Sequence, residues 1–228
     1  MSGFPILSIV VFTPLIGALI VAVAPSRYAR SLALAASLVA WVVSLLLLIG
    51  FEPNGPAGRP FQLEEAINWI PLFGIQYKVG VDGLSLILVV LTTTLTWISI
   101  LASFSPIKDR IKEYMVSFLI LAVGMIGVFV ALDTFLFYIF WEVVLVPMYL
   151  IIGIWGGANR IYATIKFVLY TLVGSLLMLV AILATAFAYQ SSTGSWTGAF
   201  DFERLHAANF DPNLQIFAFL AFFLAFAI

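Results

Sequence analysis

The fold is decided by apolar stretches such as residues 134–155, TFLFYIFWEVVLVPMYLIIGIW. A helix needs about 20 apolar residues to cross a hydrocarbon core about 30 Å thick. This stretch is long enough and carries a single charged residue, Glu142. Further stretches meet the same condition at residues 4–24, 31–51, 84–104, 114–132 and 164–189. The sequence therefore predicts an all-α polytopic membrane protein with complete transmembrane helices over these ranges, followed by the start of another.

The composition of the whole chain supports this prediction. Of the 228 residues, 64% are hydrophobic and 9% are charged, whereas a soluble domain carries about 25% charged residues. A soluble globular enzyme is therefore excluded, and the high apolar content excludes a disordered chain. The net charge is −1, so we expect no nucleic-acid partner, because a phosphate-binding surface needs clustered Lys and Arg.

The chain has few side chains of the kinds that bind metals, which excludes several classes of metal site. The chain contains no Cys and a single His, His206. Thiolate zinc sites, iron–sulfur clusters and bis-His haem ligation inside the bilayer are therefore not available. We expect this chain to bind no metal and no redox cofactor, so that any electron transfer coupled to it takes place elsewhere.

The last apolar stretch begins near Asn213 and is still apolar at Ile228, the final residue of the sequence. It is short for a membrane span, which takes about 20 residues. We expect it to be the start of an interrupted helix, and the chain to be part of a longer protein.

The basic residues predict the orientation of the chain in the membrane. They gather in the turns after the first, third and fifth spans, whereas the alternate loops are mainly acidic. The residues concerned are Arg27, Arg30, Lys108, Arg110, Lys112 and Arg160. By the positive-inside rule these turns are cytoplasmic, which places the N-terminus on the outer side.

The two long outer loops have predicted structure of their own. Residues 52–82 open with a Pro/Gly-rich stretch, after which residues 67–71 and 75–80 flank a Leu-Phe-Gly turn and indicate a β-hairpin. In the other loop, residues 201–208 are expected to form a short helix that its acidic start caps. Asp82 and Asp133 stand directly before apolar stretches and are expected to cap those helices.

Glu142 is the main candidate for a functional residue. It lies within about 4 Å of the predicted midplane of its helix, at 1.5 Å per residue. A charge at that depth costs about 2.5–3.5 kcal/mol on insertion scales, so we expect this carboxyl to bind and release a proton, as a proton relay requires. Pro147 leaves the Val143 carbonyl without its helical hydrogen bond and loosens the helix beside the carboxyl. The alternative is a carboxyl paired with a basic residue on another helix for packing alone.

Lys166 is the second candidate, near the cytoplasmic end of the sixth predicted span. Tyr170 follows it by four residues and therefore lies on the same helical face. Three roles are open for Lys166: a proton entry, a counter-charge to Glu142, or an interfacial anchor whose ammonium reaches the membrane surface.

Several separated motifs resemble one family, the antiporter-like subunits of respiratory complex I, the proton-pumping NADH:quinone oxidoreductase. The motifs are 69–71 (WIP), 80–85 (GVDGLS), 140–150 (FWEVVLVPMYL), 155–157 (WGG), 166–171 (KFVLYT) and 174–178 (GSLLM). Within the family, the run from Val146 to Tyr149 resembles the M type (chain 4) rather than the L or N types. The resemblance covers essentially the whole chain.

The resemblance implies a helix bundle with two inverted repeats, each containing a broken helix. Residues 1–112 would be an N-terminal three-helix segment with an outer β-hairpin loop at 52–82. Residues 113–228 would be the first part of the antiporter-like repeat, truncated in its seventh helix. Glu142 would be the family's fifth-helix glutamate, which pairs with a lysine of the seventh helix, and this sequence ends before that lysine.

The resemblance also implies a function and partners. The chain would belong to a membrane-arm subunit that translocates protons, coupled to electron transfer from NADH to quinone elsewhere in the complex. NADH, flavin, iron–sulfur clusters and quinone are expected in partner subunits, and other membrane-arm subunits, including neighbouring antiporter-like ones, are expected as partners beside the lipid bilayer. The expected location is the inner (plasma) membrane of a bacterium. Two alternatives remain: a D-type subunit of a multi-subunit sodium/proton antiporter, and an inert truncated fragment.

Overall fold

The computed structural model describes residues 5–52 and 60–228. Its long helices confirm the predicted all-α membrane fold, because six helices in the described ranges are long and apolar enough to span a membrane. These six are α1 (Ile6–Val23), α2 (Ala29–Gly50), α3 (Gly83–Ala102), α4 (Ile111–Val130), α5 (Thr134–Trp155) and α6 (Arg160–Thr193). Two shorter helices follow, α7 (Phe202–Ala207) and α8 (Pro212–Ala227). The start of α8 agrees with the apolar stretch predicted near Asn213.

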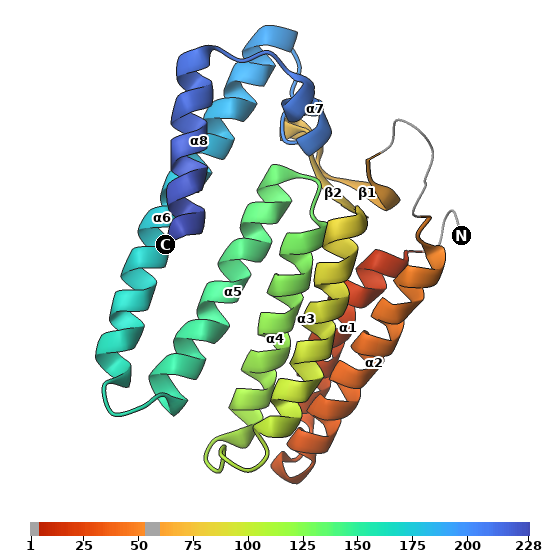
Figure 1. Cartoon of the computed structure of the whole chain (residues 1–228), viewed down its shortest axis with the longest axis vertical. Helices are drawn as coiled ribbons and strands as arrows, with labels where there is room; N and C mark the ends of the chain where they lie inside the picture. Colours follow the sequence, from red (N-terminus) through yellow and green to blue (C-terminus); the bar gives the residue numbers. More distant parts are fainter. Residues whose placement is uncertain (1–4, 53–59) are drawn as a thin grey trace.

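Helices α1 to α5 lie side by side as a bundle, and α6 and α8 form a pair beside α5 (Figure 1). Helix α4 is central, because it packs against α1, α2, α3 and α5. One apolar core joins α1, α3, α4, α5 and the second strand of the hairpin, with Val10, Val89, Ile126 and Phe140 among its buried side chains. The predicted N-terminal segment and the segment that follows it therefore share a core.

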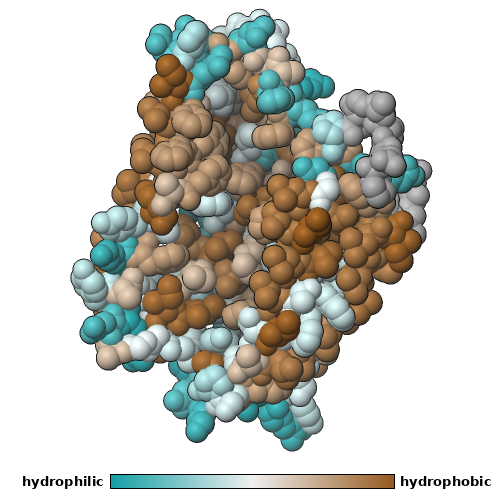
Figure 2. All heavy atoms as spheres, in the orientation of Figure 1, coloured by the Kyte–Doolittle hydropathy of each residue, from teal (hydrophilic) through white to brown (hydrophobic). Residues whose placement is uncertain are grey.

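The surface of the bundle is largely apolar. On α3, for example, Leu91, Leu95 and Ile98 are 49%, 52% and 42% exposed. Figure 2 shows hydrophobic residues over most of the middle of one face, with hydrophilic residues gathered mainly towards its ends. Large apolar side chains that face outwards at mid-height are suited to lipid, not to water. The chain is a multi-pass membrane protein.

The predicted β-hairpin is confirmed and lies at one end of the bundle, next to α7 (Figure 1). Strands β1 (Gln62–Ile70) and β2 (Ile75–Val81) pair in antiparallel fashion. The turn between them is a 3₁₀ segment that ends at Gly74, whose φ of 67° is a conformation that favours glycine. Residues 53–59, most of the predicted Pro/Gly-rich stretch, lie outside the described residues.

The hairpin supplies the cap that α1 itself lacks. Pro5 precedes α1 without a side-chain cap. Instead, the Glu65 carboxylate of β1 accepts hydrogen bonds from the backbone N–H of Leu7 at 2.7 Å and of Ser8 at 3.2 Å. A carboxylate at a helix N-terminus satisfies unpaired N–H groups and favourably meets the helix dipole. The hairpin is therefore held against the end of α1.

Helix α6 extends beyond the predicted range of 164–189 at both ends. It begins at Arg160 and ends at Thr193, where Gly194 adopts a left-handed conformation that terminates the helix. In its last turn the hydroxyls of Ser192 and Thr193 both donate to the Tyr189 carbonyl. The run of apolar residues in the sequence predicted only the part of α6 that is suited to the membrane.

Candidate functional site

Glu142 lies within α5 and has a buried oxygen without a partner. Its Oε1 atom is inaccessible to solvent and accepts no hydrogen bond in the described part of the chain. The ion pairs found within 5–52 and 60–228 belong to Lys78 and Arg110, and none includes Glu142. An unsatisfied carboxyl oxygen in an apolar interior is costly. The structure thus places in the middle of α5 a carboxyl whose buried oxygen has no hydrogen-bond partner in the described residues.

A tyrosine stands one helical turn before this carboxyl. Tyr138 precedes Glu142 by four residues and packs against the apolar cluster that includes Met178 of α6 and Ala225 of α8. The helical spacing could have indicated Tyr138, because residues four apart share a face.

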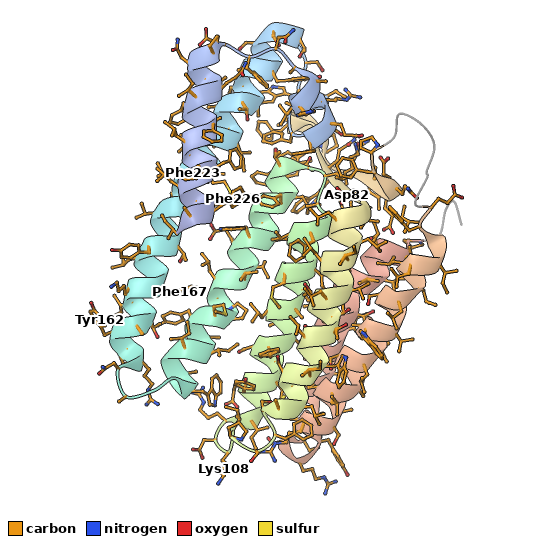
Figure 3. All side chains as sticks on the ribbon, in the orientation of Figure 1. Asp82, Lys108, Tyr162, Phe167, Phe223 and Phe226 are labelled. Atoms are coloured by element: carbon orange, nitrogen blue, oxygen red, sulfur yellow. The ribbon has the colours of Figure 1, made fainter. Side chains whose placement is uncertain are left out.

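The end of α8 covers the neighbouring face of α5. The Phe226 ring lies 5.3 Å from the Trp141 ring and 6.3 Å from the Phe137 ring. Figure 3 shows Phe226 on the side of α8 that faces α5. At Gly174 of α6, an added Cβ would lie 3.2 Å from the Cα of Ala225, so α6 and α8 approach each other closely. Helices α5, α6 and α8 therefore meet beside Trp141, the residue before Glu142.

The start of α5 is fixed by Asp133, as predicted. Its Oδ1 accepts hydrogen bonds from the N–H groups of Phe135 and Leu136, each at 3.0 Å, and its Oδ2 accepts one from the N–H of Gln76 in β2 at 2.9 Å. Burial raises the pKa of Asp133 to about 6, although these three hydrogen bonds lower it. Asp133 therefore joins α5 to the hairpin.

Helix α5 packs closely on α4 and contains the predicted proline. An added Cβ at Gly124 of α4 would lie 2.7 Å from a methyl group of Val144, and one at Gly127 would overlap the Phe140 ring. Pro147 is buried inside α5 and has no N–H to donate to the Val143 carbonyl. The face of α5 that includes Phe140 and Val144 is thus fixed against α4.

Lys166 lies on the exposed side of α6 near its start. Its ammonium nitrogen is 6.0 Å from the Tyr162 ring centre and 5.9 Å from the Tyr170 ring centre. Figure 3 shows Tyr162 on the side of α6 that faces away from the bundle. In the described parts of the chain, no ion pair joins Lys166 to Glu142. The structure does not bring the two candidate residues together, and their roles stay predictions.

A cluster around Lys78 was not anticipated from the sequence. The Lys78 ammonium lies 2.7 Å from Asp201, 2.9 Å from Glu203 and 3.9 Å from Glu64. Burial lowers the pKa of Lys78, but the hydrogen bonds and attraction of Asp201 and Glu203 outweigh it, and the pKa is raised overall. Asp201 also caps α7 by accepting from the N–H of Arg204 at 3.0 Å, which confirms the predicted short helix and its acidic cap.

The two ends of the bundle differ in their charged residues. Lys108 lies in the loop between α3 and α4, at the end opposite to Asp82 (Figure 3). Asp82 forms a capping box with Ser85, which confirms its predicted role at the start of α3. At the basic end, Arg30 donates to the Ile107 carbonyl at 2.6 Å, and the Trp155 indole donates to the Asp109 carbonyl at 2.9 Å.

A cavity of about 510 Å³ lies between the bundle and the α7–α8 segment. Its lining is mainly apolar and includes Phe61, Phe129, Phe137, Phe202, Phe222 and Phe226, together with the polar residues Asp82, Ser85, Asp133 and Thr134. Glu142 is not among the lining residues. The cavity and the buried carboxyl are therefore separate features of the structure.

Comparisons with known proteins give consistent matches. The family described as NADH:quinone oxidoreductase/Mrp antiporter, TM, matches residues 131–228. NADH-quinone oxidoreductase subunit M of Rhodobacter capsulatus is 46% identical over 98% of the chain and 45% of that protein. NADH-ubiquinone oxidoreductase chain 4 of Marchantia polymorpha is 42% identical over 97% of the chain and 43% of that protein.

Solved structures share the fold. A chain of respiratory complex I from Thermus thermophilus with bound NADH matches with a TM-score of 0.80 and 27% identity, covering 97% of this chain and 43% of that one. A chain of the Mrp complex from Dietzia sp. matches with a TM-score of 0.69 at 15% identity, covering 97% and 22%, which shows the fold alone.

The matches agree on both the branch and the extent of the likeness. The similar relatives are 37–46% identical and are described as subunit M or chain 4. The chain spans about half the length of the curated relatives it matches. Over that length, the chain belongs to the antiporter-like membrane subunits of NADH:quinone oxidoreductases, in the M (chain 4) branch of that family.

Proposed function

We propose that the chain is part of a membrane-arm subunit that translocates protons, coupled to electron transfer from NADH to quinone in other subunits. The observation that carries this proposal is the buried, unpartnered Oε1 of Glu142 in the middle of an apolar helix. A charged group is rare at such a position, and ionisable residues inside membrane proteins usually mark ion or proton pathways. The family to which the chain belongs supports the same conclusion.

The cofactors are expected in other subunits. The chain has no Cys and one His, which does not suit an iron–sulfur cluster, and by the function proposed for the family, NADH, flavin and quinone belong to the redox subunits of the complex. The Thermus thermophilus match is a chain of a whole respiratory complex with bound NADH. We therefore infer that the partners are the other membrane-arm subunits, including neighbouring antiporter-like ones, and the surrounding lipid.

A sodium/proton antiporter subunit of the D type is the second candidate. The matching family includes the Mrp antiporters, and the Dietzia Mrp complex contains a chain of the same fold. The relatives at 37–46% identity, however, are described as NADH oxidoreductase subunits. Pumping driven by NADH and blocked by quinone-site inhibitors would support the first candidate, and sodium-driven proton exchange without NADH would support the second.

Location and orientation are part of the proposal. We place the subunit in the inner (plasma) membrane of a bacterium, with the N-terminus on the outer side. The basic loop around Lys108 supports this orientation, because cytoplasmic loops are enriched in Lys and Arg. We also retain the division into residues 1–112 and 113–228, which is supported by a family match confined to the second segment.

The test is Glu142→Gln in the complete protein, assembled in its native membrane. We expect proton pumping driven by NADH to fall on the order of 100-fold, the usual contribution of a positioned acid or base. Pumping is measured as quenching of a pH-sensitive dye in inverted vesicles, with NADH oxidation recorded in parallel.

The matched control is Glu113→Gln, which makes the same chemical change in the first turn of α4. Glu113 is exposed and contacts only Arg110, at 3.4 Å, among its ion-pair partners in the described residues. The complex that carries Glu113→Gln is expected to pump protons at the normal rate. Full pumping in Glu142→Gln membranes would show that the proposal is wrong.

A further inference from the structure

Three aromatic rings meet where α8 lies against α5. The Trp141 ring centre lies 5.3 Å from that of Phe226 and 6.0 Å from that of Phe137, and the Phe137 and Phe226 centres are 6.3 Å apart. Aromatic side chains in contact have ring centres about 4.5–7 Å apart. Each ring therefore contacts the other two, and we call Phe137, Trp141 and Phe226 the ring cluster.

The ring cluster lies between the cavity and Glu142. Phe137 and Phe226 line the cavity, whereas Trp141 and Glu142 are not among its lining residues. Trp141 contacts both lining rings and directly precedes Glu142 in α5. Glu142 follows Phe137 by five residues, which is about 7.5 Å along the helix at 1.5 Å per residue. The cavity therefore ends one layer of rings before the level of the carboxyl.

The other end of the cavity reaches the surface near the hairpin. Leu84 and Phe202 belong to its lining and are 68% and 48% exposed. Its lining also includes Asp82 and Ser85, the capping box at the start of α3. Polar groups of this kind can hold water in a cavity. The cavity thus brings the hairpin side of the membrane close to Glu142.

The ring cluster has no group that can pass on a proton. A proton relay needs groups that both accept and donate a hydrogen bond, whereas a Phe ring has neither function and the Trp141 indole N–H only donates. Rings in contact leave no room for water between them, and hydrophobic constrictions in membrane proteins close a path by excluding water. A proton on Glu142 therefore has no route through the cluster into the cavity.

We propose that the ring cluster is a seal that keeps Glu142 from exchanging protons with the cavity and so with the hairpin side of the membrane. A carboxyl that carries protons in a pump must open to one side at a time, as alternating access requires. This inference rests on the proposed proton-carrying function of Glu142 and adds how access to that carboxyl is controlled.

The seal depends on the position of α8. Phe137 and Trp141 belong to α5, whereas Phe226 belongs to α8. Next to Phe226, the Cα of Ala225 lies 3.2 Å from the position of an added Cβ at Gly174, so α8 is packed closely on α6. A displacement of α8 from α5 withdraws one ring of three and joins the cavity to the level of Glu142.

The test uses the complete protein in its assembled complex, in membrane vesicles. Phe226→Ala removes the ring that α8 contributes. We expect a pH difference imposed without NADH to decay several times faster in these vesicles, because protons leak through the open seal. Phe226→Leu keeps an apolar side chain of similar reach and should restore most of the slow decay.

The matched control is Phe223→Ala, the same change on the same helix. Phe223 is 57% exposed, stacks on Phe219 at 6.1 Å and is not among the lining residues of the cavity. Its vesicles should lose the pH difference as slowly as unaltered ones. Adding Glu142→Gln to Phe226→Ala should remove the leak, because the leak passes through the carboxyl, and a leak that persists would contradict the seal.

A chemical readout measures access to Glu142 without relying on pumping. A water-soluble carbodiimide modifies protonated carboxyls that it can reach, and mass spectrometry of the subunit locates the product. In permeabilised membranes, where the reagent reaches both sides, we expect modification of Glu142 to be slow in the unaltered chain and in Phe223→Ala. In Phe226→Ala it should be several times faster.

The outcomes distinguish the seal from the proposed function. Equally slow modification of Glu142 with and without Phe226→Ala, together with an unchanged decay of the pH difference, would overturn the seal, whatever Glu142→Gln does to pumping. Normal pumping in Glu142→Gln would overturn the proposed function, and faster modification in Phe226→Ala would still support the seal. If Phe226→Ala does not assemble, Phe137→Ala removes a ring of the cluster from α5 and is judged by the same modification rate.

Discussion

Asp133 shows how a single carboxyl can connect two parts of the molecule. It caps α5 through Phe135 and Leu136, and it accepts a third hydrogen bond from Gln76 of the hairpin. Its side chain is buried, with the residue 2% exposed. Three N–H donors are enough to hold the carboxyl in place, but they do not fully replace the water that it loses.

This balance predicts a pH-dependent stability. The pKa of Asp133 is raised from 3.8 to about 6 by burial, so the folded chain binds the proton more tightly than the unfolded chain. Its contribution is therefore fully present below pH 3.8 and is lost as the pH rises through about 6, by about 2–3 kcal/mol at 1.36 kcal/mol per pH unit. The free energy of unfolding in mixed detergent micelles, measured across this range, checks the prediction.

The comparison is with Asp133→Asn, which keeps the Oδ1 acceptor that caps α5 but cannot titrate. The fall in stability between these pH values should be smaller in Asp133→Asn than in the unaltered chain. Asp109→Asn, at an exposed position in the loop between α3 and α4, should keep the full fall. The same pH dependence in all three proteins would contradict the assignment to Asp133.

At the scale of the helices, the apolar pattern was sufficient to place the spans but not their partners. Helix α5 occupies the predicted residues 134–155, with Asp133 capping its start and Gly156 following its end. Helix α6 is longer than predicted, because residues 160–163 and 190–193 continue the helix outside the apolar run that the prediction used.

The candidate site was predictable only in part, for the same reason. Glu142 stands out in the sequence because it is a charge within an apolar run. The end of α8 packs on the neighbouring Trp141 from another part of the chain, and the sequence does not say which helix faces are opposed. The ion pair of Lys78 with Asp201 joins residues 123 positions apart, so no local pattern could indicate it.

The contact between α4 and α5 predicts the effect of a single added methyl group. At Gly127 a Cβ would overlap the ring of Phe140, which is 6% exposed and held in the core. Gly127→Ala is therefore expected to destabilise the chain by about 1–3 kcal/mol, the usual cost of overpacking, although Ala favours helix formation. Thermal unfolding in detergent measures the change as a lower Tm.

Gly157→Ala provides the contrast. It adds the same methyl group in the turn before α6, where no atom lies within 4 Å of the added carbon. Its Tm should stay close to that of the unaltered chain. Equal losses in the two variants would mean that glycine flexibility, and not the close approach of α4 to α5, sets the effect.

On the scale of the whole molecule, an apolar belt separates two polar ends of different composition. At the end with the hairpin and α7, Glu64, Asp201 and Glu203 surround Lys78, and Glu65 caps α1. The opposite end includes Arg30 and the basic loop at Lys108. This asymmetry is the physical basis of the proposed orientation.

The orientation can be tested directly because the chain contains no Cys. A single cysteine at Ser192, at the hairpin end of α6, should react in intact cells with a maleimide that cannot cross the membrane. A cysteine at Lys112, at the basic end, should react only after the cells are made permeable. The reverse pattern would place the N-terminus in the cytoplasm.

The ion pair between the hairpin and α7 also sets an order for the assembly of the chain during synthesis. Lys78 leaves the ribosome 123 residues before Asp201, an interval on the order of 10 s at typical rates of synthesis. Helices α3, α4, α5 and α6 must all be made and inserted within that interval. Throughout it the Lys78 ammonium lacks Asp201 and Glu203, the closest of its counter-charges. The hairpin therefore reaches its final seat only after α6 has returned to the same side of the membrane, which makes the docking of α7 the step that locks this end of the molecule.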